Sequence, residues 1–127
     1  MIFVDTSVWV AAQRHPSSQE AERLRSLLDA DVVEVALPVR LELLAGVARK
    51  SRRSFQRLLS ALPVSYPTDG TWERLGGWVI KAADAGHRFT VTDLIIAALA
   101  YERTAHVWSL DSDFEHMEKL GFVQLYG

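Results

Sequence analysis

The 127-residue sequence contains no cysteine, which excludes disulfide bonds, thiolate metal sites and a cysteine nucleophile. It also lacks any apolar run approaching the roughly 18 residues that a membrane-spanning helix needs. The apolar start at residues 1–4 is cut short by Asp5 and has no cationic region before it, unlike a secretory signal. We therefore expect a cytoplasmic protein that does not associate with membranes.

The chain as a whole shows no strong excess of one charge sign, because its formal net charge is −2. The distribution is uneven, however. Residues 49–57 read Arg-Lys-Ser-Arg-Arg-Ser-Phe-Gln-Arg, with five cations and no acid. A basic strip of this kind suits the phosphate backbone of a nucleic acid. It is equally typical of a solvent-exposed helix face, and charge alone does not decide between the two.

Length and composition indicate one globular unit, since 127 residues with 49% hydrophobic content can bury a full core. We expect a single domain over residues 1–127, with no internal repeat and no linker. Hydrophobic patterning predicts strands at 2–4, 32–37, 64–66, 106–110 and 122–125, with helices in the intervals between them. Strands that alternate with helices predict an α/β fold, in which a parallel sheet lies between helical layers.

Capping residues indicate where several of these helices should begin. Ser17 and Glu20 fit a capping box, Thr68 precedes a long helix, and Thr92 precedes the most hydrophobic helix, at residues 93–103. The apolar positions of the long helix recur at helical spacing and predict a buried face. That face consists of Trp72, Leu75, Val79 and either Ala82 or Ala83.

Acidic residues stand where short apolar runs stop or start. They are Asp5, Glu42, Asp93 and Asp111, with Asp113 beside the last. In an open parallel sheet the strand ends face the functional crevice, so we expect these side chains to gather there. Carboxylates gathered in one place repel one another unless a cation lies between them, and a hard ion such as Mg²⁺ is suited to that place. The pattern indicates metal-dependent phosphoryl chemistry, and nuclease chemistry in particular.

Each acid taken singly has a plain structural alternative. Asp5 and Asp93 also suit helix N-caps, and Asp111 with Asp113 suits a surface turn. Glu42 is the most informative, because it lies within an apolar stretch where a charge on the buried side needs a partner. If Glu42 faces solvent, that argument lapses for this residue.

Four blocks of sequence together carry a family resemblance. They read Ile-Phe-Val-Asp-Thr-Ser-Val-Trp (2–9), Leu-Glu-Leu-Leu-Ala-Gly (41–46), Thr-Asp-Leu-Ile-Ile-Ala-Ala-Leu-Ala (92–100) and Ser-Leu-Asp-Ser-Asp-Phe (109–114). In this order they resemble the signature blocks of PIN-domain ribonucleases, and more narrowly those of VapC-type toxins of toxin–antitoxin pairs. The resemblance covers nearly the full chain, and none of its catalytic acids is missing.

The resemblance implies a three-layer α/β/α sandwich with a central, mainly parallel sheet, and cleavage of RNA that depends on Mg²⁺, with Mn²⁺ as a possible substitute. The family's catalytic acids match Asp5, Glu42, Asp93 and Asp111. A metal site would consist of Asp5, Asp93, Asp111 and Asp113. Because Mg²⁺ takes few direct carboxylates, we expect Asp5 and Asp93 to bind it directly, and Glu42 and Asp111 through water. We expect Asp113 to orient these ligands without binding the metal directly.

Two hydroxyl positions accompany the acids in the resemblance. Thr6 matches a small hydroxyl residue beside the first Asp, and Ser109 stands where the family more often has Thr. Either hydroxyl can hold a loop or a carboxylate, so Ser109 is a mild departure. Both are therefore expected to support the acidic residues.

The implied function is that of an endoribonuclease toxin that cuts structured RNA, tRNA or rRNA, with a metal-activated water as the nucleophile. The resemblance further implies a homodimer and a VapB-like antitoxin partner. The cationic residues expected to contact RNA are Arg14, Arg40, Arg49, Lys50, Arg52 and Arg53. Two alternatives stay open: a catalytically silent PIN-like RNA-binding or assembly module and, with less support, an Asp-based phosphoryl-transfer domain.

Overall fold

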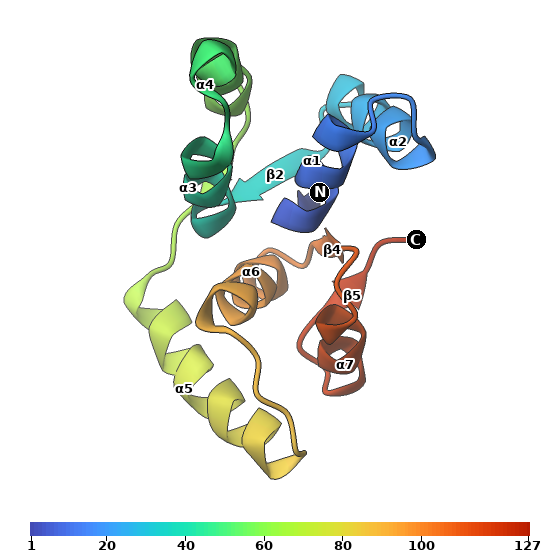
Figure 1. Ribbon diagram of the computed structural model, residues 1–127. Coiled ribbons are helices and arrows are strands. Elements are labelled where there is room, and N and C mark those ends of the chain that lie inside the picture. The colour runs from blue at the N-terminus through green and yellow to red at the C-terminus, as the bar shows by residue number, and fades with distance from the viewer.

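A computed structural model describes all 127 residues of the chain (Figure 1). Its centre is a sheet with the strand order β3-β2-β1-β4-β5, in which every neighbouring pair is parallel. The strands are β1 (Ile2–Val4), β2 (Val33–Ala36), β3 (Val64–Ser65), β4 (His106–Trp108) and β5 (Gln124–Leu125). The prediction of an α/β fold with a parallel sheet is therefore confirmed; β1 has its predicted bounds, and the other four strands are shorter than expected.

Helices fill every connection between the strands. They are α1 (Thr6–Arg14), α2 (Gln19–Asp29), α3 (Leu37–Gly46), the 3₁₀ turn η1 (Arg49–Ser51), α4 (Arg52–Ser60), α5 (Asp69–Asp84), α6 (Val91–Glu102) and α7 (Asp113–Lys119). Parallel neighbours require crossovers, and right-handed crossovers place the helices before β3 and those after β3 on opposite faces. In Figure 1, α1 and α2 lie on one side of the sheet and α5 and α6 on the other. None of the helices combines the length and apolar character that a bilayer crossing requires.

The core is built around β1, β2 and α6. Every residue of β1 and β2 is buried, because helices cover both faces of the sheet. Helix α6 packs on both of these strands and on β4, and residues 94–100 are all buried. Since α6 is enclosed in this way, its first residues are held firmly at the edge of the sheet.

One carboxylate lies inside this apolar core. Glu34 of β2 is only 3% exposed, and Ser65 of β3 donates a hydrogen bond to it. The guanidinium of Arg103, just after α6, approaches the same carboxylate, with Nε 2.6 Å from Oε2. A buried charge is tolerated when it is paired and hydrogen-bonded, so this contact fastens the end of α6 to the sheet.

Two of the predicted helix caps were displaced. Ser18, rather than Ser17, caps α2 by accepting a hydrogen bond from the Ala21 N–H at 3.1 Å. Thr90, rather than Thr92, caps α6, because its hydroxyl accepts from a backbone N–H three residues further along the chain. The predicted cap of α5 by Thr68 is confirmed. Helix α6 thus begins earlier than expected, which places Asp93 within its first turn.

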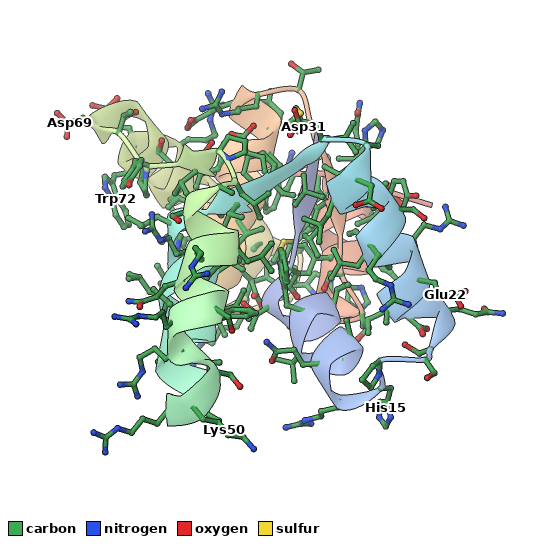
Figure 2. The ribbon with its side chains drawn as sticks, turned by 90° about the horizontal axis from the view of Figure 1, so that it is seen from above. His15, Glu22, Asp31, Lys50, Asp69 and Trp72 are labelled. Carbon is green, nitrogen blue, oxygen red and sulfur yellow. The ribbon has the colours of Figure 1, made fainter.

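The predicted buried face of α5 was only half correct. Leu75 and Ala82 are buried, but Trp72 and Val79 are 51% and 50% exposed. The helix is rotated from the expected orientation, because Thr71 is turned inward and donates to a Glu102 carboxylate oxygen at 2.6 Å. Figure 2 shows Trp72 on the outer side of the molecule. Helix α5 therefore presents an apolar face that the chain itself does not cover.

Candidate metal centre and active site

The crevice of this sheet lies between the ends of β1 and β4. The chain runs from β1 to β2 and β3 on one side, then crosses to β4 on the other, so the loops leaving β1 and β4 diverge. Ligand sites of open α/β sheets form at such a switch point. Asp5 follows β1 directly, and its N–H donates to the Trp108 carbonyl at the end of β4 at 2.9 Å. The structure therefore brings the first predicted acid to the crevice.

Asp5 is buried, with 5% of its surface exposed, and it is held by two serines. The hydroxyls of Ser7 and Ser109 each donate to its Oδ2 atom at 2.7 Å. Asp5 stands at the N-cap position of α1, yet its side chain makes no capping bond. Its carboxylate is therefore not used to cap the helix. Its Oδ1 atom has no hydrogen-bond partner within the chain, so it is available for binding in the crevice.

The same two serines shape the loop after β4. Ser7 Oγ accepts from the Leu110 N–H, and Ser109 Oγ accepts from the Asp111 N–H, both at 3.0 Å. Asp111 Oδ1 in turn accepts from the Asp113 N–H at 2.9 Å. Each serine thus donates to Asp5 and accepts from the loop, which links the two strand ends into one network.

Three carboxylates converge in this crevice. Asp93, Asp111 and Asp113 each offer one oxygen, and the three atoms lie within 4.8 Å of one another. Asp93 comes from the first turn of α6, and the other two come from the segment between β4 and α7. Three residues named from sequence alone are therefore neighbours in space, although Asp93 lies far from the other two along the chain.

Burial and the neighbouring carboxylates raise the pKa of Asp93 from 3.8 to about 6. Burial is the largest cause, because it penalises the charged carboxylate, and the negative charge of Asp5 comes next. The hydrogen bond with Thr90 opposes the rise, while Asp111 and Asp113 add to it. A divalent cation would reverse this repulsion, so the donor set, made of carboxylate oxygens only, fits a hard ion such as Mg²⁺ or Mn²⁺.

The acids form a group of three with a fourth beside it. Asp113, expected behind the ligands, belongs to the converging group, whereas Asp5, expected as a direct ligand, lies beside it. Asp5 is nevertheless close enough for its charge to act on Asp93 more strongly than that of any other residue. The three-residue group with Asp5 next to it is the candidate metal centre.

Glu42 lies at the rim of the site rather than inside it. Its side chain is exposed on α3, so Glu42 is not a buried charge that needs a partner. The Thr6 hydroxyl donates to its Oε1 at 3.1 Å and thereby joins α3 to the start of α1. Thr6 therefore supports Glu42, while the role expected for it beside Asp5 falls to Ser7.

The sequence between residues 2 and 120 matches the family model described as the PIN domain. The chain belongs to the PIN-domain family. Ribonuclease VapC11 of Mycobacterium tuberculosis is 30% identical to this PIN domain over 129 residues, covering 98% of this chain and 96% of the relative. The resemblance seen in the four sequence blocks is thereby confirmed.

Solved structures match the fold of this PIN domain over nearly its whole length. VapBC2 from Rickettsia felis, bound to a DNA fragment from its promoter, has a TM-score of 0.76 and 19% identity, with 99% of this chain and 98% of that chain covered. VapC20 from Mycobacterium tuberculosis, described as a toxin that cleaves the sarcin–ricin loop, has a TM-score of 0.66 and 18% identity, with coverages of 91% and 94%. At these identities the two structures bear on the fold alone.

The predicted cationic residues lie on α1, α3, η1 and α4. Arg49, Lys50, Arg52 and Arg53 are exposed on η1 and α4, and Arg14 is exposed at the end of α1. Arg40 on α3 is partly buried. In Figure 2, Lys50 and His15, the residue after Arg14, extend from the same side of the molecule.

Two residues of the site escaped the sequence analysis. Ser7 is one of them, because nothing local in the sequence indicates that its hydroxyl holds Asp5. Thr90 could have been found, because Thr90 and Asp93 are three residues apart, the spacing of a capping pair. Both act by fixing the backbone or side chain of an acidic residue.

Proposed function

We propose that this PIN domain is a metal-dependent endoribonuclease toxin of the VapC type. The observation that carries the proposal is the convergence of Asp93, Asp111 and Asp113 within 4.8 Å, beside the buried Asp5. Support also comes from the full-length similarity to ribonuclease VapC11. A phosphodiester resists attack because it is anionic, and a site that concentrates carboxylates can act on it only together with cations.

Asp93, Asp111 and Asp113 are the residues that would hold Mg²⁺ or Mn²⁺, with Asp5 beside them. When bound, such an ion neutralises the phosphate oxygens and lowers the pKa of the attacking water. Ser7 and Ser109 keep the Asp5 carboxylate fixed, so that its free Oδ1 can orient this water and accept its proton. Glu42, held by Thr6, is assigned a supporting role at the rim.

The reaction is a hydrolysis in which all atoms are accounted for. The water oxygen forms a bond to phosphorus while the bond from phosphorus to the 3′ oxygen breaks. A carboxylate takes one proton of the attacking water, and the leaving 3′ oxygen takes a proton from a solvent water; the carboxylate later returns its proton to solvent. The products carry a 5′-phosphate and a 3′-hydroxyl, and no covalent bond to the protein forms at any stage.

The proposed substrate is a structured RNA, either tRNA or rRNA. The exposed cations of η1 and α4 offer contacts for its backbone, since Arg and Lys bind phosphates independently of sequence. VapC20, which shares the fold, is described as cleaving the sarcin–ricin loop, which makes folded RNA loops the first substrates to test.

The proposed protein partner is a VapB-like antitoxin. An apolar groove of about 160 Å³ runs between α1, α2 and α4. Trp9 and Phe55 meet in it edge to face, with ring centroids 6.3 Å apart. A groove of this kind accepts the apolar face of an amphipathic helix. The R. felis relative of this fold was solved as a VapBC pair, which makes an antitoxin segment the occupant to test.

The exposed face of α5 is the proposed contact between two copies of the chain. Trp72, Val79, Ile80 and the neighbouring Val91 of α6 are each at least half exposed, and two successive glycines, Gly76 and Gly77, lie among them. Apolar side chains grouped in this way favour association. Val79→Glu should therefore convert a dimer into a monomer in sedimentation analysis, whereas an unchanged mass would exclude this face.

The experiment that tests the proposed activity is cleavage of a total small-RNA pool by protein freed of any co-purified partner. New 5′-phosphate ends would be mapped by sequencing after incubation with Mg²⁺, Mn²⁺ or EDTA. We expect discrete cuts that require the metal and disappear in Asp93→Asn. Folded protein that cuts no RNA with either metal would instead favour the silent RNA-binding module.

A further inference from the structure

A second concave feature adjoins the acidic crevice. It has a volume of about 250 Å³ and lies between the start of α2 and the ends of β4 and β5. Its lining consists of Gln19, Glu20, Arg23, Trp108, Leu110, Tyr126 and Gly127. We call it the aromatic pocket. In Figure 1 the chain after β5 runs past β4 toward α2, which brings these distant segments together.

The aromatic pocket shares a wall with the catalytic loop. Leu110 lines the pocket, and its two neighbours in sequence are Ser109, which holds Asp5, and Asp111 of the acidic group. Adjacent Cα atoms lie about 3.8 Å apart, so the pocket begins within one residue of the metal centre. Trp108, which also lines the pocket, accepts the Asp5 N–H through its carbonyl. A nucleotide next to the scissile phosphate can therefore reach the pocket.

The chemistry of the pocket matches a nucleobase. The rings of Trp108 and Tyr126 lie 5.7 Å apart at an angle of 56°, and the Arg23 guanidinium lies 5.9 Å from the centre of the tyrosine ring. Arg23 also donates to the Tyr126 hydroxyl at 2.8 Å, which fixes both side chains. Unstacked RNA bases bind on aromatic rings and on arginine planes.

Two polar side chains of α2 remain available at the edge of the pocket. Gln19 and Glu20 line it, and neither side chain takes part in a hydrogen bond or ion pair within the chain. A carboxylate accepts hydrogen bonds from the exocyclic amino groups of adenine, cytosine and guanine. Uracil has no such amino group and offers a single imino N–H between two carbonyl oxygens, which would face the carboxylate unfavourably. Glu20 thus favours a base that carries an amino group.

We propose that the aromatic pocket binds one unstacked, amino-bearing base of the RNA next to the scissile phosphate. The proposal rests on the proposed ribonuclease function, and it assigns Tyr126 and Arg23 to base stacking and Glu20 to base selection. The pocket differs from the groove between α1, α2 and α4, whose lining is mainly apolar. A mainly apolar groove fits a protein helix, whereas rings beside a cation and a free carboxylate fit a base.

The test measures binding separately from cleavage. Fluorescein-labelled hexamers of oligo(A), oligo(C) and oligo(U) would be titrated against the Asp93→Asn protein, with anisotropy as the readout. We expect oligo(A) and oligo(C) to bind more tightly than oligo(U). Adding Tyr126→Ala should weaken binding of oligo(A) about 5-fold or more, because stacking on one ring contributes at least that much. Tyr126→Phe, which keeps the ring, should bind nearly as well as the parent.

Glu20→Gln supplies the test of selection. It should reduce the preference for oligo(A) and oligo(C) over oligo(U) while leaving the protein folded, since Glu20 makes no internal bond. In cleavage mapping with the otherwise unaltered protein, Tyr126→Ala should also change which nucleotides flank the cuts. Far-ultraviolet circular dichroism and thermal melting would verify that each variant is folded.

Several results would overturn the proposal. Tyr126→Ala protein that binds all hexamers as tightly as its parent, and cuts at the same positions, would remove any role in base binding. The same unchanged RNA binding with a weakened antitoxin complex would assign the pocket to the protein partner. A different outcome separates the two proposals. If the protein cuts no RNA but Tyr126→Ala loses oligo(A) binding, base binding in the pocket is supported and the proposed nuclease activity is contradicted.

Discussion

Ser109 donates a 2.7 Å hydrogen bond to the Asp5 carboxylate across 104 residues of sequence. This contact joins the ends of the two strands between which the sheet reverses its order. Ser7, in the first turn of α1, donates to the same oxygen. The orientation of Asp5 is therefore set by two hydroxyl groups, one from α1 and one from the loop after β4, and it is fixed before any cation or RNA arrives.

Replacing Ser109 tests whether this orientation matters for activity. Ser109→Ala should lower the rate of RNA cleavage about 10-fold, because a hydrogen bond to a charged group contributes about 1.5–3 kcal/mol. Ser109→Thr keeps the hydroxyl and should retain most of the rate. Ser112→Ala is the matched control, since the Ser112 side chain in the same loop makes no capping bond. Equal rates for Ser109→Ala and Ser112→Ala would contradict a role for this contact.

The raised pKa of Asp93 predicts a pH-dependent stability in the absence of divalent ions. The folded state holds the Asp93 proton up to about pH 6, whereas the unfolded state releases it near 3.8. The free energy of unfolding should therefore fall as the pH rises through this interval and remain lower above it. Asp93→Asn should remove this decline and stabilise the protein at neutral pH by about 1 kcal/mol, a value reduced because the carboxyl is partly solvated.

Urea denaturation in EDTA at pH 4.5 and at pH 7.5 measures this difference. The comparison between the two proteins isolates Asp93 from the other titrating groups. Parallel pH dependence in the two proteins would show that Asp93 carries no unfavourable charge in the folded state. Adding Mg²⁺ at pH 7.5 should stabilise the protein with Asp93 intact and have less effect on Asp93→Asn.

The buried pair of Glu34 and Arg103 should contribute to folding rather than to chemistry. Arg103→Ala leaves the Glu34 carboxylate with Ser65 as its remaining partner, and the free energy of unfolding should fall by about 2 kcal/mol. The value lies below that of a fully buried pair, because 53% of the Arg103 side chain is exposed. Glu34→Gln in the same protein should recover part of the loss.

Denaturant unfolding curves measure this effect, with Arg88→Ala as the control. Arg88 is exposed and makes no ion pair, so its removal should change stability little. An Arg103→Ala protein as stable as the control would show that Ser65 alone satisfies the carboxylate.

The basic residues of η1 and α4 should bind RNA mainly through phosphates. Replacing Arg49, Lys50 and Arg52 by Gln in the Asp93→Asn background should weaken binding to every RNA by a similar factor. The slope of log affinity against log salt should become shallower by about 2, since each lost phosphate contact contributes about 0.7 on single strands. Arg88→Gln should leave the slope unchanged. If the triple variant has the same slope as its parent, the RNA binds to another surface of the protein.

Much of the fold and part of the site follow from sequence, because both depend on local pattern. Short apolar runs predicted the strands, and the acids at their ends included the three that converge, Asp93, Asp111 and Asp113, although Glu42 lies outside this group. The partner of Glu34 could not be predicted, since Arg103 is distant in sequence and is brought near only by packing. Helical periodicity revealed an apolar face on α5 but not its orientation, because Thr71 and Glu102 decide the rotation of the helix through a tertiary bond.

The aromatic pocket has no signature in the sequence at all. Trp108 and Tyr126 lie in different strand ends, and Arg23 comes from a helix whose position is set by the crossover. Their meeting is a consequence of strand order, which places β5 beside β4 at the edge of the sheet. Only the tertiary structure brings these aromatic residues together with a cation and a free carboxylate.

The most direct test of the account is calorimetric titration of the purified protein with Mn²⁺, and then with Mg²⁺, at neutral pH. We predict saturable binding that is lost in Asp93→Asn and in Asp111→Asn. Asp84→Asn, which removes an exposed acid at the end of α5, should bind as the unaltered protein does. Equal binding by all four proteins, or binding lost only in Asp84→Asn, would contradict a metal centre formed by Asp93, Asp111 and Asp113.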